Sequence, residues 1–278
     1  MKENKFSLID GNQVDTFAIE WRPETNPKAV IVLIHGLGEH CKRYKNVAKF
    51  FTQKGIGIIS ADLYGHGKTG GKRGYIPIED AFLNTIDALL IKAKELYSNL
   101  PIFLYGHSMG GWAVMWYSLD RKPGINGVIA TSPFLAEHKP SSPLKIFLAR
   151  VMNTLNPSFI MKNGLDLDAL SRDKEVVTKY KNDPLVHGFI SARLGWTMLN
   201  KGKWIIAHAA EFPLPLLLMV GSGERIVSQQ LIEEFVKKAP HVDYKIWPAL
   251  YHELHNEPEK ESVLIYELDW ITKHLQMK

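Results

Sequence analysis

Short apolar runs that recur along the chain, with helix-compatible segments between them, constrain its fold more than any other feature. A strand covered on both faces of a sheet reads as an unbroken apolar run, because neither face meets water. Since these runs alternate with helical segments and several end at glycine, we expect an α/β fold with a doubly wound, mostly parallel sheet. The runs cover residues 29–34, 57–61, 101–105, 127–131 and 214–220.

Apolar residues at helical spacing lie between the runs, and a final strand and helix follow them. Asp10-Gly11 predicts a hairpin over residues 5–20, and residues 243–247 predict the last strand of the sheet. The expected helices cover residues 43–54, 78–97, 112–121 and 229–238, with another that starts near residue 258.

The alternation of strands and helices breaks between residues 133 and 208. We expect this segment to form a helical cap, or lid, over the strand ends, and residues 1–132 and 209–278 to form the core. Apolar residues from 144 to 155 recur at the spacing of an amphipathic helix. Two interpretations of that helix stay open: it is buried against the sheet, or its apolar face lines a substrate channel and touches lipid. The residues assigned to this acyl channel are Phe147, Leu148, Val151, Met152 and Leu155.

The composition of the 278 residues is that of a globular protein from a reducing compartment. The single cysteine, Cys41, excludes an intrachain disulfide. No apolar run approaches the about 20 residues of a membrane-spanning helix, and the first residues lack a signal-peptide pattern. We therefore expect a cytoplasmic protein that meets membranes only peripherally. The net charge of +5 is scattered, without the basic helix or aromatic groove that predicts nucleic-acid binding.

Gly106-x-Ser108-x-Gly110 follows an apolar run and precedes a helical segment. A serine in a sharp turn between strand and helix presents its hydroxyl outside the backbone surface, and only small residues fit beside it. At the N-terminus of the following helix, the helix dipole and the free N–H groups favour negative charge. Ser108 is therefore the candidate nucleophile. The alternative is a glycine-rich turn with an ordinary capping serine.

An activated serine needs a base, and the base needs an orienting acid. In hydrolases of this architecture the acid follows the next-to-last strand and the histidine follows the last. Glu224 and His252 occupy these places. His255 is the competing base, and Asp243 and Glu253 are the alternative acids. Because aspartate is the usual acid, we expect the longer Glu224 side chain to hold the imidazole less firmly unless its loop retracts.

The oxyanion formed during acyl transfer needs two backbone N–H groups. Met109, the residue after the nucleophile, should supply one, and Leu37 should supply the other. His35 and His66 lie in glycine-rich turns and are expected to brace those loops. The side chain of His107 is expected to point away from the site.

Two short patterns that could suggest a metal or a nucleotide are rejected. A helical H-E-x-x-H zinc motif that starts at His252 would need a histidine at position 256, which is Asn256. The G-x-G-x-x-G match at residues 65–70 is not followed at once by a helix. We therefore expect neither a metal nor a cofactor.

Motifs spread over nearly the whole chain resemble the monoacylglycerol lipase and lysophospholipase group of the α/β-hydrolases; the resemblance is weak only over residues 137–180. It implies Ser108 as nucleophile, His252 as base, Leu37 and Met109 as oxyanion donors, and a lid that admits single-chain lipids. One departure is Glu224, where the group usually has aspartate. The motifs are His35-Gly36-x-Gly38-Glu39-His40, Asp62-x-x-Gly65-His66-Gly67 with Gly74-Tyr75, Gly106-His107-Ser108-Met109-Gly110-Gly111, Asn182-Asp183-Pro184-Leu185 and His252-Glu253-Leu254.

We predict a serine esterase that cleaves monoacylglycerols or similar single-chain lipid esters through an acyl-enzyme on Ser108. One alternative is a peptidase of the proline-iminopeptidase type, which would bind a free amino terminus through acids of the cap such as Glu137, Asp166 and Asp168. The other is a binding protein on a catalytically weak hydrolase scaffold. The expected partner is a small lipid ester, with transient contact between the cap and a membrane surface. No signal in the sequence indicates an oligomeric state.

Overall fold

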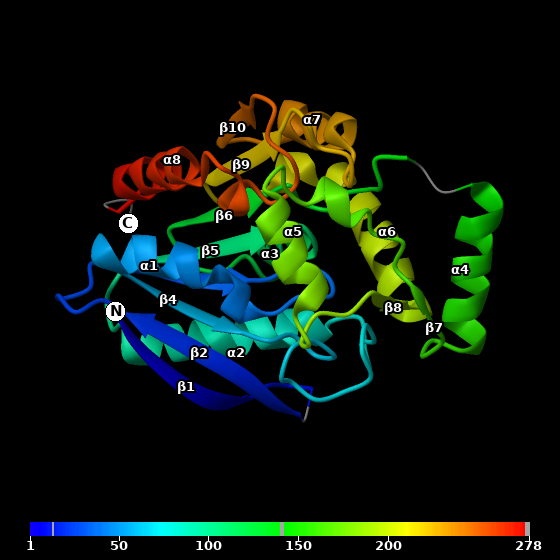
Figure 1. Ribbon diagram of the computed structural model, residues 1–278, viewed down its shortest axis with the longest axis horizontal. Helices are drawn as coiled ribbons and strands as arrows, with labels where there is room; N and C mark the ends of the chain where they lie inside the picture. Colours follow the sequence, from blue (N-terminus) through cyan, green and yellow to red (C-terminus); the bar gives the residue numbers. More distant parts are fainter. Residues whose placement is uncertain (13, 140–141, 276–278) are drawn as a thin grey trace.

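An eight-stranded sheet forms the centre of the molecule (Figure 1) in a computed structural model that describes residues 1–12, 14–139 and 142–275. β1 and β2 form an antiparallel hairpin, β2 pairs antiparallel with β4, and the other pairings of this sheet are parallel. The predicted mostly parallel sheet is confirmed. In spatial order the strands are β1 (Lys2–Ile9), β2 (Asp15–Arg22), β4 (Ile56–Ala61), β3 (Ala29–Ile34), β5 (Ile102–His107), β6 (Gly127–Thr131), β9 (Leu216–Gly221) and β10 (Val242–Trp247).

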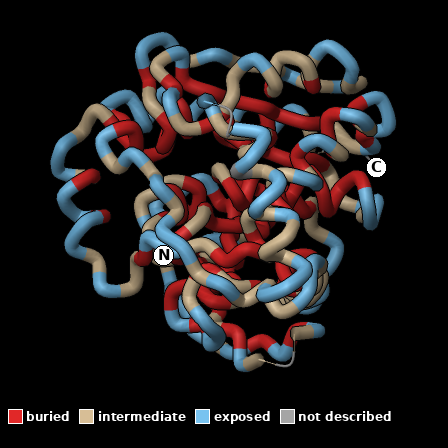
Figure 2. The backbone as a smooth tube through the Cα atoms, turned by 90° about the vertical axis from the view of Figure 1, so that its right-hand side faces the viewer, coloured by how far each residue is buried: buried red, intermediate tan, exposed pale blue. Residues whose placement is uncertain are grey.

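Alternate residues of the central strands pack against opposite faces, and helices cover both. In β3, Ile31 and Leu33 belong to one apolar cluster, whereas Val32 and Ile34 belong to the other. Figure 2 shows that the buried backbone gathers in the centre of the molecule. The central strands read as unbroken apolar runs because neither face is open to water. One face carries α1 (Lys45–Gln53) and α8 (Lys260–Lys273), and the other carries α2 (Ala81–Leu96), α3 (Met109–Arg121) and α7 (Gln229–Lys238).

The strands and helices predicted for the core are present, and their ends differ from expectation by a few residues at most. β5 continues beyond the expected end at Tyr105 because its pairing with β6 reaches His107 opposite Thr131. A short 3₁₀ turn that the sequence did not predict, η4 (Leu254–Asn256), follows β10, and the other elements that the sequence did not predict lie between β6 and β9. They are β7 (Ile160–Lys162), α5 (Lys174–Asn182), β8 (Phe189–Ser191), α6 (Ala192–Ala207) and three-residue 3₁₀ turns that include η2 (Leu167–Ala169).

The predicted amphipathic helix is present as α4 (Pro143–Leu155). It packs on α6 at one end of the molecule, away from the sheet (Figure 1). The interpretation that it is buried against the sheet is wrong, because Leu144, Phe147 and Leu155 of α4 are exposed. That residues 133–208 form a separate cap unit remains a proposal. No helix in the described ranges has both the length and the apolarity to cross a bilayer.

A carboxyl group is buried inside the core, where α8 packs on the sheet. Glu267 is fully buried and accepts a hydrogen bond of 3.2 Å from the Tyr105 hydroxyl, while its Oε2 has no partner among the described residues. Burial raises the pKa of Glu267 to about 8, and the Tyr105 hydrogen bond opposes this only in part. In the unfolded chain the same group would titrate near its ordinary value of 4.5.

We predict that the free energy of unfolding falls between about pH 4.5 and pH 8, because over this range the folded state holds a proton that the unfolded state has lost. Glu267→Gln removes this titration. The variant should match the wild type at pH 4 and be more stable at pH 8, by on the order of 3 kcal/mol. Urea unfolding at both pH values measures the difference. Equal pH dependence of the two proteins would show that Glu267 ionises normally in the fold.

Candidate active site

Ser108 occupies a strained turn between β5 and α3. Its backbone is in the left-handed half of conformational space, with φ 54° and ψ −115°, which is costly for a residue other than glycine. The turn is tight enough that a Cβ on Gly106 would overlap the Gly110 carbonyl, and a Cβ on Gly110 would overlap the Ile34 carbonyl. These contacts explain why glycine stands on either side of Ser108.

The side chain of Ser108 makes no capping hydrogen bond to α3, so the interpretation as an ordinary capping serine is wrong. Its main chain is held instead. The Ser108 N–H donates to the Thr131 carbonyl at 2.9 Å, and the Ser108 carbonyl accepts from the N–H of Trp112 and of Phe134. The hydroxyl therefore stays available at the N-terminus of a helix, where the dipole favours an anion.

Glu224 and His252 form a direct pair. His252 Nδ1 lies 2.8 Å from Glu224 Oε2, and both residues are buried. The second carboxylate oxygen accepts from the N–H groups of Ile226 at 2.7 Å and Val227 at 3.2 Å. We expected Glu224 to hold the imidazole less firmly than aspartate would. Instead, both of its carboxylate oxygens are hydrogen-bonded, because the chain after β9 folds back over the Glu224 side chain.

The two members of this pair shift each other's pKa in opposite directions. Burial alone would raise the pKa of Glu224, but the charge of His252 and three hydrogen bonds lower it below its ordinary value. Burial alone would lower the pKa of His252, but the Glu224 carboxylate raises it above its ordinary value, with smaller contributions from Glu253 and Glu39. The pair is thus arranged to stabilise an imidazolium during a reaction.

Two consecutive residues at the end of β6 hold the serine turn and the histidine loop together. Thr131 accepts from the Ser108 N–H, and the Ser132 hydroxyl donates to the His252 carbonyl at 3.0 Å. His107 also contacts the base, since its ring lies 4.7 Å from that of His252 and bonds to the Thr131 hydroxyl. The expectation that His107 points away from the site is wrong.

The competing residues are engaged elsewhere. The His255 ring stacks on Tyr44 at 4.6 Å, and burial lowers its pKa to about 4, which leaves it uncharged at neutral pH. Asp243 accepts from the Trp270 indole at 2.7 Å, and Glu253 pairs with Arg43. None of these carboxylates is bonded to the His252 ring in the described chain.

The two expected oxyanion donors lie on loops that touch. Met109 is the first residue of α3, a position whose N–H has no acceptor within an α-helix. Leu37 follows β3, and the neighbouring Gly36 N–H is held at 2.6 Å by the Glu39 carboxylate. A Cβ on Gly36 would meet that of Ser108 at van der Waals distance. That these two N–H groups bind an oxyanion remains a proposal.

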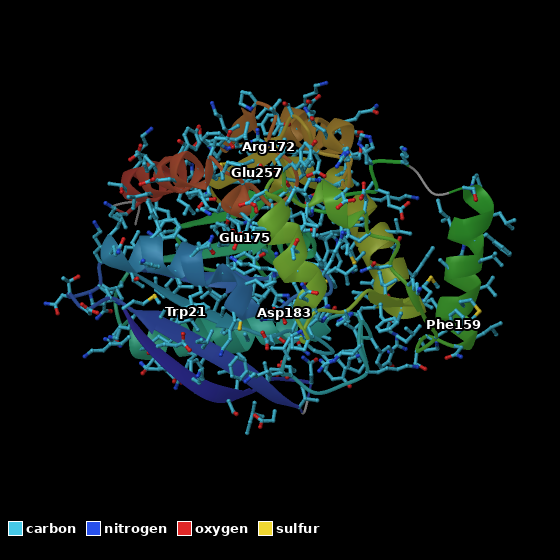
Figure 3. All side chains as sticks on the ribbon, in the orientation of Figure 1. Trp21, Phe159, Arg172, Glu175, Asp183 and Glu257 are labelled. Atoms are coloured by element: carbon cyan, nitrogen blue, oxygen red, sulfur yellow. The ribbon has the colours of Figure 1, made fainter. Side chains whose placement is uncertain are left out.

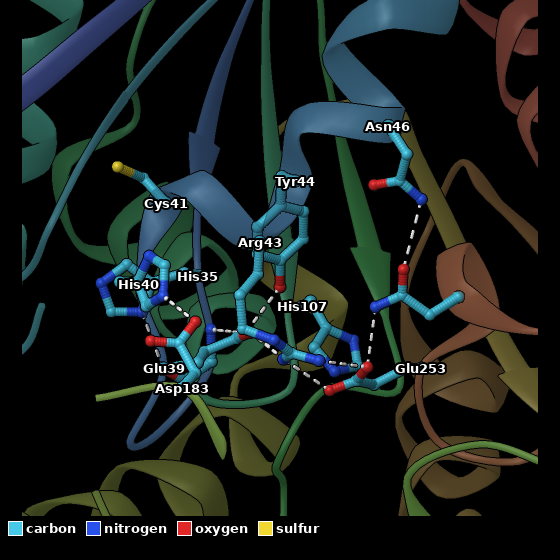
Figure 4. A network of polar contacts seen from close by, with 12 residues as sticks. His35, Glu39, His40, Cys41, Arg43, Tyr44, Asn46, His107, Asp183 and Glu253 are labelled. Atoms are coloured by element: carbon cyan, nitrogen blue, oxygen red, sulfur yellow. Dashed lines mark hydrogen bonds and ion pairs between the residues drawn. The ribbon is translucent and has the colours of Figure 1, made fainter. Parts of the chain in front are cut away.

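A buried arginine that the sequence did not single out joins the loop after β3 to the loop after β10 (Figure 4). Arg43 donates to both oxygens of Glu253, at 2.7 and 2.8 Å, and also to Glu39. Its guanidinium lies 4.6 Å from the ring centre of Tyr180 in α5. Burial would raise the pKa of Glu253, but Arg43 lowers it to about 2. The only local sign of this network is the spacing of Glu39 and Arg43, four residues apart.

The segment between α5 and β8 is fixed to the loop after β3. His40 Nε2 lies 2.9 Å from the Asp183 carboxylate, and the His187 N–H donates to the Gly38 carbonyl at 2.8 Å. His35 Nε2 accepts from the Leu63 N–H at 2.9 Å and braces its loop as expected. The described residues contain no cluster of His, Cys, Asp or Glu suited to a metal ion.

The residues assigned to an acyl channel all lie on α4. Phe147 and Leu148 are exposed, and Val151 and Met152 are half-buried. An open hollow of about 260 Å³ is lined by Phe147, Val151 and Leu155 together with Arg150 and Thr154. That these side chains guide an acyl chain remains a prediction.

Known proteins with related sequences and structures are numerous. A family model described as serine aminopeptidase, S33, matches residues 25–259. A monoacylglycerol lipase of Mycolicibacterium smegmatis is 36% identical over 92% of this chain and 92% of its own length. The chain is also 35% identical over 92% of its length to an uncharacterized abhydrolase domain-containing protein of Dictyostelium discoideum, but it spans only 27% of that protein. The crystal structure of a Paleococcus ferrophilus monoacylglycerol lipase has a TM-score of 0.85 and 31% identity, covering 94% of this chain and 99% of that one.

We predict that shortening the acid weakens the site. In Glu224→Asp, the carboxylate cannot reach His252 and keep its bonds to the Ile226 and Val227 N–H groups, so kcat for ester hydrolysis should fall about tenfold. Asp243→Asn is the matched control and should leave kcat unchanged, because Asp243 bonds only Trp270 among the contacts seen. A rise in kcat for Glu224→Asp would contradict this account of the pair.

The pH profile should report the His252–Glu224 pair. A base must be neutral, so kcat/KM should rise with pH through the raised pKa of His252, with its midpoint above the ordinary value of 6.5. Glu224→Gln removes the charge that raises this pKa. Its residual activity, about 10³- to 10⁴-fold lower, should have a midpoint at lower pH. If the midpoint of this rise in kcat/KM is the same in the variant and the wild type, the rise reports the titration of a group other than His252.

Proposed function

The chain belongs to the serine aminopeptidase S33 family of α/β-hydrolases, and on this premise we propose that it hydrolyses monoacylglycerols or similar single-chain lipid esters. The observation that carries the reaction is the buried Glu224–His252 hydrogen bond of 2.8 Å, beside a serine in a strained strand–helix turn. The substrate class is supported by the monoacylglycerol lipase that is similar over 92% of both chains.

In the proposed reaction, the Ser108 hydroxyl attacks the ester carbonyl while His252 Nε2 takes its proton. Glu224 holds Nδ1 and stabilises the imidazolium. The N–H groups of Leu37 and Met109 bind the oxyanion of the tetrahedral intermediate. The protonated imidazole then gives its proton to the leaving alcohol. Water, deprotonated by the same histidine, attacks the acyl-enzyme, and the histidine then returns this proton to the Ser108 oxygen as the fatty acid leaves.

We further propose that α4 brings the cap to a lipid surface. Phe147 is 60% exposed and Leu155 76% exposed, and Phe159 and Phe189 add apolar area nearby in the cap. Exposed apolar residues gathered on an amphipathic helix are typical of membrane-surface contact. Such contact would place the substrate's acyl chain next to the cap.

The peptidase alternative has less support. Asp166 accepts from the Asp168 N–H and begins a 3₁₀ turn, while the Asp168 carboxylate is exposed and lies 3.4 Å from Lys181. Glu137 lies in an isolated bridge with Val227. The Asp166 carboxylate thus serves within a turn, and the Asp168 carboxylate lies on the surface beside Lys181. The binding-protein alternative conflicts with the Glu224 carboxylate, which is fully bonded to the base and to its own loop.

We predict that activity on p-nitrophenyl esters from C2 to C16 is highest at medium or long chains and falls by at least about 10³-fold in Ser108→Ala. The same panel should include a monoacylglycerol, a lysophospholipid and a proline aryl-amide. Preference for the monoacylglycerol supports the proposal. Cleavage of the amide alone would move the assignment to a peptidase, and absence of Ser108-dependent turnover on every substrate would move it to a binding protein.

A further inference from the structure

We propose that Arg172 and Glu257 are positioning residues, which fix the loop of His252 against the base of the cap. This inference rests on the proposed role of His252 as the base. Neither residue lies in the serine turn, in the oxyanion loop or next to the acid. Figure 3 shows the two side chains together where the cap segment before α5 meets the loop after β10.

The Glu257 carboxylate is fully buried and uses both oxygens. Oε1 accepts from the Tyr251 N–H at 2.8 Å and from the Arg172 N–H at 3.1 Å. Oε2 accepts from Arg172 Nε at 2.9 Å. One carboxylate therefore ties the residue that precedes His252 to the main chain and side chain of the cap.

The same two segments are joined along their length. The His252 N–H donates to the Ala169 carbonyl at 3.4 Å, and the Glu253 N–H donates to the Leu170 carbonyl at 2.8 Å. The Ser171 hydroxyl donates to the Asn256 carbonyl at 3.2 Å. The Arg172–Glu257 pair is the last of these contacts along the chain, directly before the start of α5.

The loop of the acid joins the same place. Arg225, the residue after Glu224, donates to the Asp168 carbonyl at 2.9 Å, and its guanidinium lies 4.6 Å from the ring centre of Tyr251. The cap segment 168–172 thus contacts the loops that carry both members of the Glu224–His252 pair. The geometry of that pair depends on a segment that is distant in the sequence from both of its members.

Loss of Arg172 would leave the Glu257 carboxylate buried without its charged partner, an arrangement that proteins avoid. The loop would relax to solvate this charge, and Tyr251 and His252 would move with it. A displacement of about 1 Å at a catalytic group can cost on the order of 100-fold in rate. A partial displacement should therefore lower kcat, while KM for a small soluble ester, which makes few contacts with the cap, should change little.

The experiment compares Arg172→Ala, Arg172→Lys and Glu257→Gln in the full chain. Lys179→Ala is the matched control, because Lys179 forms an exposed ion pair with Glu175 on α5 of the same cap. The measurements are kcat and KM on a short p-nitrophenyl ester, the rate at which a fluorophosphonate labels Ser108, and the thermal midpoint. Ser108→Ala is assayed beside them, since its activity tests the proposed function separately.

We expect kcat to fall about tenfold in Arg172→Ala and Glu257→Gln, with KM within about twofold and labelling slowed in parallel. Arg172→Lys should recover part of the loss. The double variant Arg172→Ala/Glu257→Gln should be no slower than the slower single variant, because the two residues act as one unit. Lys179→Ala should match the wild type.

A folded Arg172→Ala with wild-type kcat and labelling rate would overturn the proposal, even if its thermal midpoint is lowered, because the pair would then be structural only. A rise in KM at unchanged kcat would overturn it as well. If Glu257→Gln does not fold, the two Arg172 variants still decide, since this side chain is 30% exposed. Wild-type activity in Ser108→Ala would instead reject the proposed function.

Discussion

The burial of both faces of the sheet decides where polar chemistry can occur in this protein. The layers above and below the central strands are mainly apolar, and the buried Glu267 carboxyl there has a raised pKa, so reactive groups gather where the parallel strands end. Ser108 follows β5, Glu224 follows β9 and His252 follows β10. β6 lies between β5 and β9, and its last residue, Thr131, bonds to the serine turn, while Ser132, which follows the strand, bonds to the histidine loop.

Ion pairs on buried carboxylates then set the positions of these loops relative to one another. Arg43 joins the loop after β3 to Glu253, and Arg172, in the segment before α5, pairs with Glu257. Each buried carboxylate would be costly without its arginine, so each pair resists separation more strongly than an exposed pair would. The segment 168–172 is therefore more than a neighbour of the site, because it contacts the two loops that carry the Glu224–His252 pair.

The core could be predicted from the sequence because its signals are local. Apolar runs marked the strands, and the order of Ser108, Glu224 and His252 followed from the ends of those strands. Arg43 and Glu253 lie 210 residues apart, and Arg172 and Glu257 lie 85 apart, so no local pattern announces either pair. The position of α4 was also beyond prediction, because an amphipathic pattern does not say whether its apolar face meets protein or solvent. The hydrogen bonds that hold the Glu224 carboxylate depend on how the loop after β9 folds back, and the residue types of that loop do not reveal this.

We propose that Ser108 becomes acylated with His252 as its base. The most direct test is to mix the protein with a p-nitrophenyl ester at acid pH, quench early, and locate the acyl adduct by peptide mass spectrometry. We expect a burst of p-nitrophenol and a single adduct on Ser108, with both lost in His252→Ala. An adduct on another residue, or turnover without any adduct or burst when deacylation is made rate-limiting, would contradict it.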